Sequence, residues 1–206
     1  MIAKKSTKIR KEEIIQAALD VIGRGGVRAL TIATLAEAAG MSEANIYRHF
    51  GRKDDVFTAV AEYISSAVME KAATIAMERL SPITKMEAIF FSHMRLIQER
   101  PGVPRFVFSE EVHIGNEKVA QTLSSRIGNY IETVTGLVSA GIQEGELKAE
   151  LSSRETAATM IGMIQFTALR WTIGGGDFDI SVEAARLWKN FYNIIRTAPE
   201  MTDSLR

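Results

Sequence analysis

Cysteine is absent from this 206-residue sequence, and proline occurs only four times. Without cysteine, the chain has no disulfide scaffold, thiolate zinc site, iron–sulfur cluster or cysteine nucleophile, and this composition suits a reducing cytosol. No apolar run reaches the roughly 18 residues that a membrane-spanning helix needs. The basic N-terminus is not followed by an apolar segment that would indicate a secretory signal. We therefore expect a cytoplasmic protein with no membrane partner.

Catalytic and metal-binding motifs are equally scarce. The sequence contains three histidines and no Gly-x-Ser-x-Gly, Walker A or His-Glu-x-x-His pattern. His93 and His113, with Glu110 and Glu111, offer donors that could gather around a metal. Solvated acidic residues at the end of a short helix explain the same pattern. We therefore predict a protein that is not an enzyme and has neither a metal site nor a cofactor.

Basic residues are concentrated at the start of the chain. The formal net charge is zero, yet the first eleven residues contain Lys4, Lys5, Lys8, Arg10 and Lys11 and no acidic residue. A basic segment before a near-neutral body is typical of a protein that binds a polyanion, although a solvated terminus has the same composition. Apolar residues make up 46% of the chain, which is typical of a globular protein of one domain or two small ones.

Helical periodicity dominates the sequence, and no strand-like alternation persists for more than a few residues, so we predict an all-α fold. Pro101 to Pro104 reads as a turn, and Ser152 with Glu155 as a capping box. The nine expected helices cover residues 8–24, 31–39, 42–50, 54–79, 82–100, 105–112, 116–144, 152–173 and 181–196.

The most informative stretch is residues 31–50, which reads as two short helices joined by a tight turn at Gly40. The apolar positions have the spacing to pack the two helices against each other, and the small residues Ala36 and Ala39 allow their axes to cross closely. This pattern predicts a helix-turn-helix. The second helix of such a motif is narrow enough to enter the major groove of B-DNA.

Residues 8–60 resemble the TetR family of bacterial one-component transcriptional regulators. Gly51 departs from the family pattern, which often has proline there. The residues that carry the resemblance are Thr31, Ile32, Leu35, Ala36, Ala39, Gly40, Met41, Ser42, Ile46, Tyr47, His49, Phe50, Lys53 and Asp54.

The resemblance implies DNA-phosphate contacts from Thr31, Ser42, Tyr47, His49 and Lys53. The chemistry of these side chains is suitable, since hydroxyl, imidazole and ammonium groups can donate to phosphate oxygens. Other interpretations remain for single residues. Ser42 suits a helix N-cap as well, Tyr47 suits a core position, and His49 on its own suits an ordinary surface histidine.

Base contacts are expected from the first exposed turn of the second helix. Asn45 suits adenine, Glu43 suits the amino group of cytosine, and Ala44 suits the methyl group of thymine. Arg48 lies one turn further along and can reach a base or a phosphate. Glu43 could instead only complement the helix dipole.

The remainder of the chain resembles the family's effector domain, which encloses a small-molecule cavity. Candidate lining residues lie on amphipathic helices, although aromatic and Met residues at such spacing also build an ordinary core. Walls of this kind suit a small apolar or aromatic effector. The candidates are Phe90, Met94, Phe108, Tyr130, Met163 and Phe166.

The last two expected helices are apolar on more than one face. The family uses these helices to form a four-helix bundle with a second subunit, so the resemblance implies a homodimer with interface residues Ile161, Ile164, Trp188 and Tyr192. Burial of both faces within one chain would explain the same pattern.

We expect two domains: a three-helix bundle with the helix-turn-helix over residues 1–52, and a larger effector-binding and dimerisation domain over residues 53–206. The predicted function is a ligand-responsive repressor that binds a palindromic double-stranded DNA operator as a dimer. The alternative is a helical ligand-binding or scaffolding protein that has no DNA-binding activity.

Overall fold

The computed structural model describes residues 6–198, and over this range it confirms the all-α fold. Ten α-helices and one 3-10 helix, η1, follow one another along the chain. Their bounds are α1 Thr7–Gly25, η1 Val27–Ala29, α2 Ile32–Ala38, α3 Glu43–His49, α4 Lys53–Ala76, α5 Pro82–Glu99, α6 Gly102–Val107, α7 Glu110–Ile114, α8 Glu117–Gln143, α9 Ser153–Ile173 and α10 Ile180–Ile195.

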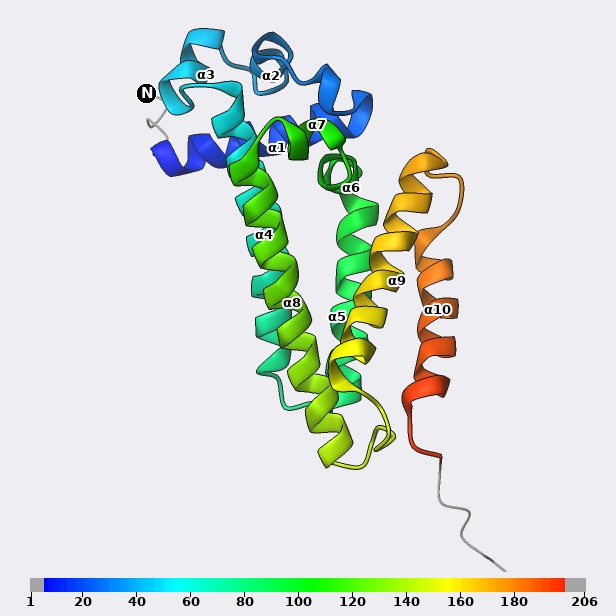
Figure 1. Cartoon of the computed structure of the whole chain (residues 1–206). Coiled ribbons are helices and arrows are strands. Elements are labelled where there is room, and N and C mark those ends of the chain that lie inside the picture. Colours follow the sequence, from blue (N-terminus) through cyan, green and yellow to red (C-terminus); the bar gives the residue numbers. More distant parts are fainter. Residues whose placement is uncertain (1–5, 199–206) are drawn as a thin grey trace, which may run out of the picture.

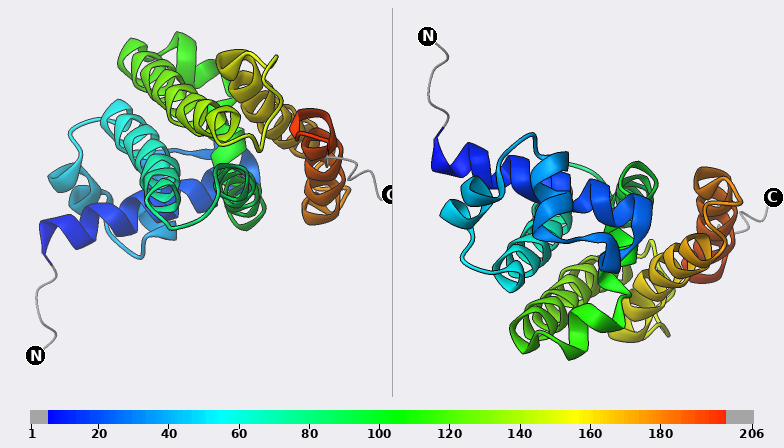
Figure 2. Two further views of the ribbon diagram at one scale, coloured as in Figure 1. Left: turned by 90° about the horizontal axis from the view of Figure 1, so that it is seen from below. Right: turned by 90° about the horizontal axis from the view of Figure 1, so that it is seen from above.

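Helices α1, α2 and α3 lie together at one end of the molecule, and α4 extends from them into a larger bundle (Figure 1). Helices α5 and α8 pack against the lower part of α4, and α9 packs against α5 and α8. The views along the bundle place α10 at its outer edge beside α9 (Figure 2). Helix α10 is therefore far from α2 and α3, and α6 and α7 lie between the two parts of the molecule.

Side-chain caps and glycine fix the ends of the N-terminal helix. The hydroxyl of Ser6 accepts a hydrogen bond from the backbone N–H of Ile9 at 3.3 Å, which begins α1. The helix ends before Gly26, whose φ of 76° lies in the left-handed region that glycine adopts without strain. These local signals explain why this helix was predicted closely from the sequence.

The structure corrects the prediction for residues 101–114. The expected turn from Pro101 to Pro104 is largely helical, because α6 begins at Gly102. Proline fits the first turn of a helix, where its missing N–H is not needed. The single expected helix over 105–112 is also wrong, because the extended backbone of Ser109 separates α6 from α7. Ten α-helices therefore replace the nine that were expected.

The expected capping box at the start of α9 is absent. Ser152 precedes the helix, but its side chain makes no capping hydrogen bond with Glu155 or its backbone. Proline at the first position of α5 was predicted correctly, since Pro82 begins that helix.

Two hydrophobic clusters make up the core. The first joins α1, α2 and α3 to the beginning of α4 and to α6, and includes Ile14, Ile46 and Phe106. The second joins the rest of α4 to α5, α8, α9 and α10, and includes Phe90 and Trp188. Helix α4 therefore contributes to both clusters and connects the N-terminal helices to the larger bundle.

Helix α6 crosses α1 at very short range. A Cβ atom added to Gly102 would lie 2.1 Å from the carbonyl oxygen of Leu19, and one added to Gly23 would lie 3.1 Å from the backbone nitrogen of Gly102. The side chain of Arg100 also donates a hydrogen bond to the side-chain oxygen of Gln16 in α1. The absence of side chains at this crossing therefore brings the larger bundle directly against the first helix.

Candidate functional site

The helix-turn-helix forms as predicted from the sequence. Thr31 caps α2, because its hydroxyl accepts a hydrogen bond from the N–H of Thr34 at 3.1 Å, and Ser42 caps α3 by accepting from the N–H of Asn45 at 3.2 Å. Gly40 has a φ of 61°, and the N–H of Met41 donates to the carbonyl of Ala36 at 2.9 Å. These bonds set the angle between α2 and α3.

One side of α3 is buried and the opposite side is exposed. Ile46 packs in the first cluster together with Phe50 at the end of the helix. Glu43 and Ala44 are exposed, and Asn45 is half-buried. The first turn of α3 therefore presents the three expected base-contacting residues outside the core.

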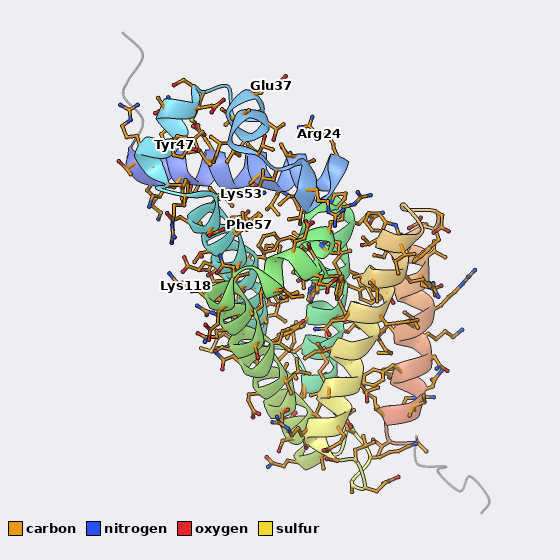
Figure 3. The ribbon with its side chains drawn as sticks, turned by 45° about the horizontal axis from the view of Figure 1, so that its top comes forward. Arg24, Glu37, Tyr47, Lys53, Phe57 and Lys118 are labelled. Atoms are coloured by element: carbon orange, nitrogen blue, oxygen red, sulfur yellow. The ribbon has the colours of Figure 1, made fainter. Side chains whose placement is uncertain are left out.

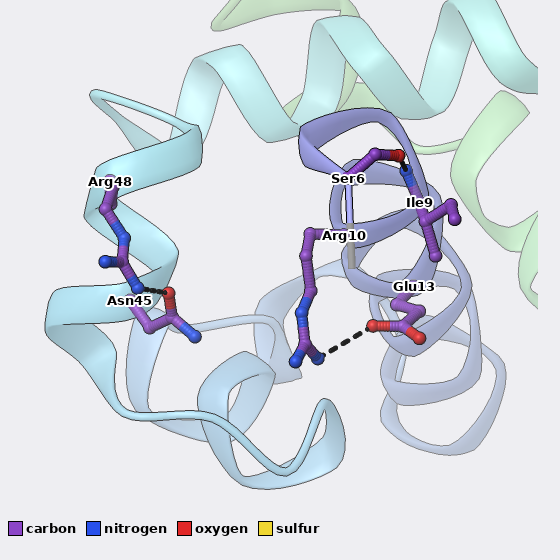
Figure 4. A network of polar contacts seen from close by, with 6 residues as sticks. All are labelled: Ser6, Ile9, Arg10, Glu13, Asn45 and Arg48. Atoms are coloured by element: carbon purple, nitrogen blue, oxygen red, sulfur yellow. Dashed lines mark hydrogen bonds and ion pairs between the residues drawn. The ribbon is translucent and has the colours of Figure 1, made fainter. Parts of the chain in front are cut away.

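Arg48 and Asn45 form a hydrogen bond on this face. The guanidinium of Arg48 donates to the side-chain oxygen of Asn45, three residues earlier on α3 (Figure 4). The amide NH₂ of Asn45 remains available as a donor. Since an amide oxygen has two lone pairs, it can accept a second hydrogen bond from a base while Arg48 holds it.

The residues with expected phosphate contacts lie at the start of α2, at both ends of α3 and at the start of α4. Thr31 and Ser42 are exposed, and Tyr47 is 51% exposed. Tyr47 lies among the N-terminal helices, and Lys53 lies close to Phe57 where α4 begins (Figure 3). The exposure of the Tyr47 ring argues against the core position that the sequence left open.

His49 and Lys53 are more constrained. His49 is half-buried, and its Nδ1 is buried without a hydrogen-bond partner. The Nζ atom of Lys53 lies 5.1 Å from the ring centroid of Phe57. At the start of α4, the carboxylate of Asp55 accepts a hydrogen bond from the backbone N–H of Arg52 at 3.0 Å. This backbone N–H is therefore already paired with an anionic group and is not free for a phosphate.

Sequence reasoning overlooked Lys11 as a specific site residue. Its Nζ lies 5.2 Å from the ring centroid of Phe50, which brings a positive charge from α1 to the end of α3. The basic segment at the chain start was the available signal. Within that segment, Arg10 pairs with Glu13 at 3.0 Å, and Lys4 and Lys5 lie outside the described residues.

A cavity of ≈ 90 Å³ lies between α4, α5, α6, α8 and α9. Its walls are mainly apolar, and they include Ile64 of α4, Ile97 of α5 and Leu123 of α8. Two of the residues expected at an effector site, Phe108 and Tyr130, lie in its wall.

The other four candidates for the cavity wall lie elsewhere. Phe90 and Met94 are buried in the second cluster, and Met163 is packed against that cluster. Phe166 is 64% exposed on α9. The helical spacing of these residues was read correctly, but the sequence does not define which side of each helix faces the cavity.

Three of the four expected dimer-interface residues belong to the core of the chain. Ile161, Ile164 and Trp188 have exposures of 2%, 0% and 5%, so they offer little surface to a partner subunit. Trp188 packs 5.4 Å from Phe90, measured between ring centroids. Tyr192 is half-buried. The low exposures of Ile161, Ile164 and Trp188 agree with the other interpretation of the sequence, burial within one chain.

The residues considered for a metal site point in different directions. His93 lies against Tyr130, Glu111 pairs with Arg28, and His113 donates to a backbone carbonyl of α6 at 2.6 Å. In the part of the chain that the structure describes, no three His, Cys, Asp or Glu residues gather as metal ligands. No helix between residues 6 and 198 is long and apolar enough to cross a membrane.

Comparison with known proteins identifies both parts of the chain. Residues 14–60 match the model of bacterial regulatory proteins of the tetR family, and residues 52–196 match that of the C-terminal region of YsiA-like proteins. The Fatty acid metabolism regulator protein of Bacillus subtilis is 23% identical over 168 residues, which is 82% of this chain and 86% of that protein. The nucleoid occlusion factor SlmA of Marinobacter nauticus is 28% identical over 72% of this chain and 74% of its own length.

Solved structures share the fold over most of its length. The regulator FadR of Bacillus subtilis, in complex with stearoyl-CoA, has a TM-score of 0.74 and 22% identity over 88% of this chain and 97% of that chain. A TetR regulator of Haloarcula marismortui has a TM-score of 0.79 and 17% identity over 92% of this chain and all of that one. With the helix-turn-helix in place, the chain belongs to the TetR family of bacterial regulatory proteins and is a DNA-binding transcriptional regulator.

Proposed function

We propose that the protein is a ligand-responsive repressor that binds a pseudo-palindromic DNA operator as a homodimer in the cytoplasm. The observation that carries this proposal is the exposed first turn of α3. Glu43, Ala44 and Asn45 lie there outside the core, while Ile46 and Phe50 anchor the other side of the helix. A helix held in this way can enter the major groove with its N-terminal residues against base edges.

Phosphate contacts would fix the position of α3 in the groove. The hydroxyls of Thr31, Ser42 and Tyr47 are exposed at the ends of α2 and α3. Lys53 and His49 lie at the following turn and add a charged donor and an imidazole. These five residues carry no base-specific geometry, so their role in the proposal is orientation and affinity.

A homodimer would be formed through the exposed face of α9 and α10. Phe166, Ile173 and Val182 expose large apolar surface on this side of the molecule. The views along the bundle place both helices at its edge, where a second copy has access (Figure 2). We propose these residues as interface contacts in place of Ile161, Ile164 and Trp188. Tyr192 remains a proposed contact at the edge of the interface.

The effector would occupy the cavity between α4, α5, α6, α8 and α9. Its apolar lining favours a largely apolar ligand. The complex of the structural neighbour FadR with stearoyl-CoA supports an acyl chain as one candidate ligand. The division into residues 1–52 and 53–206 follows as a proposed separation of DNA binding from effector binding.

Repression would be relieved through α4 and α6, which both contact the N-terminal helices. A ligand changes DNA binding only if its affinity differs between the conformation that fits the operator and the one that does not. Because α6 crosses α1 without intervening side chains, an effector that displaces α6 would move α1. The distance between the two α3 helices of a dimer would then no longer match successive major grooves.

Selection from a library of random DNA duplexes tests the proposal. The full chain should enrich an inverted repeat whose half-site centres lie about one helical turn apart. Adding an effector that binds in the cavity should release the enriched duplex from the protein. If no sequence is enriched over the starting library at low or moderate salt, the protein does not act as a sequence-specific repressor.

A further inference from the structure

The cavity in the effector domain adjoins a second hollow. This outer hollow of ≈ 270 Å³ lies between α4, α5 and α8, and its mouth carries Lys71, Arg95 and Glu99. Only three residues line both spaces: Val68, His93 and Tyr130. The inner cavity of ≈ 90 Å³ is much smaller than the roughly 300 Å³ at which ligand sites usually begin, but with the outer hollow of ≈ 270 Å³ the two spaces together exceed that size. An effector that occupies both spaces would therefore lie beside His93 and Tyr130.

These two residues form a polar pair at the junction. The Nδ1 atom of His93 lies 3.3 Å from the hydroxyl oxygen of Tyr130. No hydrogen bond to Nε2 of His93 occurs among the described residues. Ser65 and Gln165 line the inner cavity as well, but neither reaches the outer hollow.

The pair keeps one free donor in either tautomer. If the Tyr130 hydroxyl donates to Nδ1, the proton of His93 is on Nε2 and can be donated to a ligand. If Nδ1 carries the proton and donates to Tyr130, the hydroxyl hydrogen of Tyr130 is free instead. A hydrogen-bond acceptor of a ligand at the junction therefore finds a donor in both cases.

The charge state of the pair excludes one class of acceptor. Burial lowers the pKa of His93 to about 4 and raises the pKa of Tyr130, so both groups are neutral near pH 7. His93 is half-buried and lines both hollows. Arg126 lines the inner cavity, and Lys71 and Arg95 line the outer hollow. At the His93–Tyr130 pair itself, however, a carboxylate would lose hydration and meet only neutral donors, which is unfavourable.

We propose that the His93–Tyr130 pair binds an uncharged carbonyl group in the middle of an elongated, largely apolar effector. Esters, thioesters and ketones have this chemistry, whereas free carboxylic acids are ionised at neutral pH. One end of the effector fills the inner cavity and the other lies in the outer hollow. This inference rests on the proposed effector site, and it adds the ligand class and the two residues that select it.

A matched ligand series tests the proposal by isothermal titration calorimetry on the full chain. Butyl pentanoate has the carbonyl in the middle of the chain, butyl pentyl ether of the same carbon number lacks it, and octanoate carries a charge. We expect the wild-type chain to bind the ester about three- to tenfold more tightly than the ether, which is the range of one net hydrogen bond. Octanoate should bind less tightly than the ester. Equal affinity for ester and ether, or no binding of either, would overturn the proposal without any variant.

Substitutions of His93 and Tyr130 test whether this pair causes the preference for the ester over the ether. His93→Phe and Tyr130→Phe together remove every hydrogen-bonding group of the pair at similar volume, so ester and ether should bind equally. Each single variant should retain part of the preference, because the remaining partner can still donate. The control Ile164→Val alters the cavity wall without a polar change and should shift both affinities by the same factor. A double variant that keeps the full preference contradicts the assignment.

DNA titrations of the same samples separate this proposal from the repressor proposal. If the chain prefers the ester through His93 and Tyr130 but enriches no DNA sequence, the ligand site stands and the repressor function fails. If DNA is bound specifically but the ester has no advantage over the ether, the ligand class is wrong and the repressor function stands.

Discussion

The guanidinium of Arg48 donates a hydrogen bond to the side-chain oxygen of Asn45 on the exposed face of α3 (Figure 4). This bond fixes the orientation of the Asn45 amide before DNA is bound. Asn45 can then present one acceptor and one donor to the edge of an adenine, which is the pair of contacts that reads this base. In the proposed DNA complex, Arg48 would therefore support base recognition and also place a positive charge near the groove.

Substitution of Asn45 by Ala should lower sequence specificity. We expect a loss of about 1–3 kcal/mol on the selected operator, because a bidentate base contact contributes this much discrimination. Binding to scrambled duplex should change little. Titrations against both duplexes at one salt concentration measure the difference. Equal weakening on both duplexes would place Asn45 among the phosphate contacts.

Substitution of Lys53 by Ala should weaken binding to all DNA by a similar factor. The loss of one neutralised phosphate per subunit should reduce the slope of log affinity against log salt by about one unit per subunit. Tyr47→Phe, which removes only a hydroxyl, serves as the matched variant and should weaken binding without changing the slope. A Lys53→Ala variant with an unchanged salt slope would mean that its ammonium does not contact phosphate.

Substitution of Phe166 by Glu should separate the subunits of a dimer. The ring is 64% exposed in the single chain, so the charge stays solvated in a monomer but would be buried in the proposed interface. Sedimentation velocity should show a folded monomer. Trp188→Ala is the contrasting variant, since removal of a buried Trp should destabilise the fold by about 3–5 kcal/mol. A Phe166→Glu chain that remains dimeric places the interface elsewhere.

Substitution of Gly102 by Ala should disturb the contact between α6 and α1. The added Cβ would overlap the Leu19 carbonyl oxygen at 2.1 Å, so α6 has to move away from α1. We expect a lower free energy of unfolding and altered operator affinity. Gly136→Ala on α8 is the control, because a Cβ there meets no atom within 4 Å and should stabilise the helix by about 1 kcal/mol. Urea unfolding measures both, and equal effects of the two substitutions would contradict the role of the crossing.

Stability should fall on acidification because of His93. Burial lowers its folded pKa to about 4, whereas an unfolded histidine titrates near pH 6.5. Between these values the unfolded chain binds a proton that the folded chain does not, so lowering the pH through this window favours unfolding. From pH 7 to pH 5 we expect a loss of roughly 2 kcal/mol from this residue. Urea titrations of the wild type and His93→Phe should show a smaller loss in the variant.

The sequence alone determined the helix-turn-helix, because its signals are local. Thr31 and Ser42 are capping residues, Gly40 permits a left-handed turn, and the apolar spacing around Ile46 fixes the buried side of α3. Each of these effects acts over a few residues along the chain. The all-α fold and the exposed residues of the recognition helix could therefore be predicted without knowledge of the distant contacts.

Only the tertiary structure decided which surfaces of the larger bundle are core, cavity or exposed face. Trp188 and Phe166 both lie on amphipathic helices, but Trp188 packs against Phe90 while Phe166 remains exposed, because the rotation of each helix depends on its neighbours. His93 and Tyr130 meet only because α5 packs against α8. A helical pattern gives the spacing of side chains along one helix, whereas the packing of several helices determines what each side chain faces.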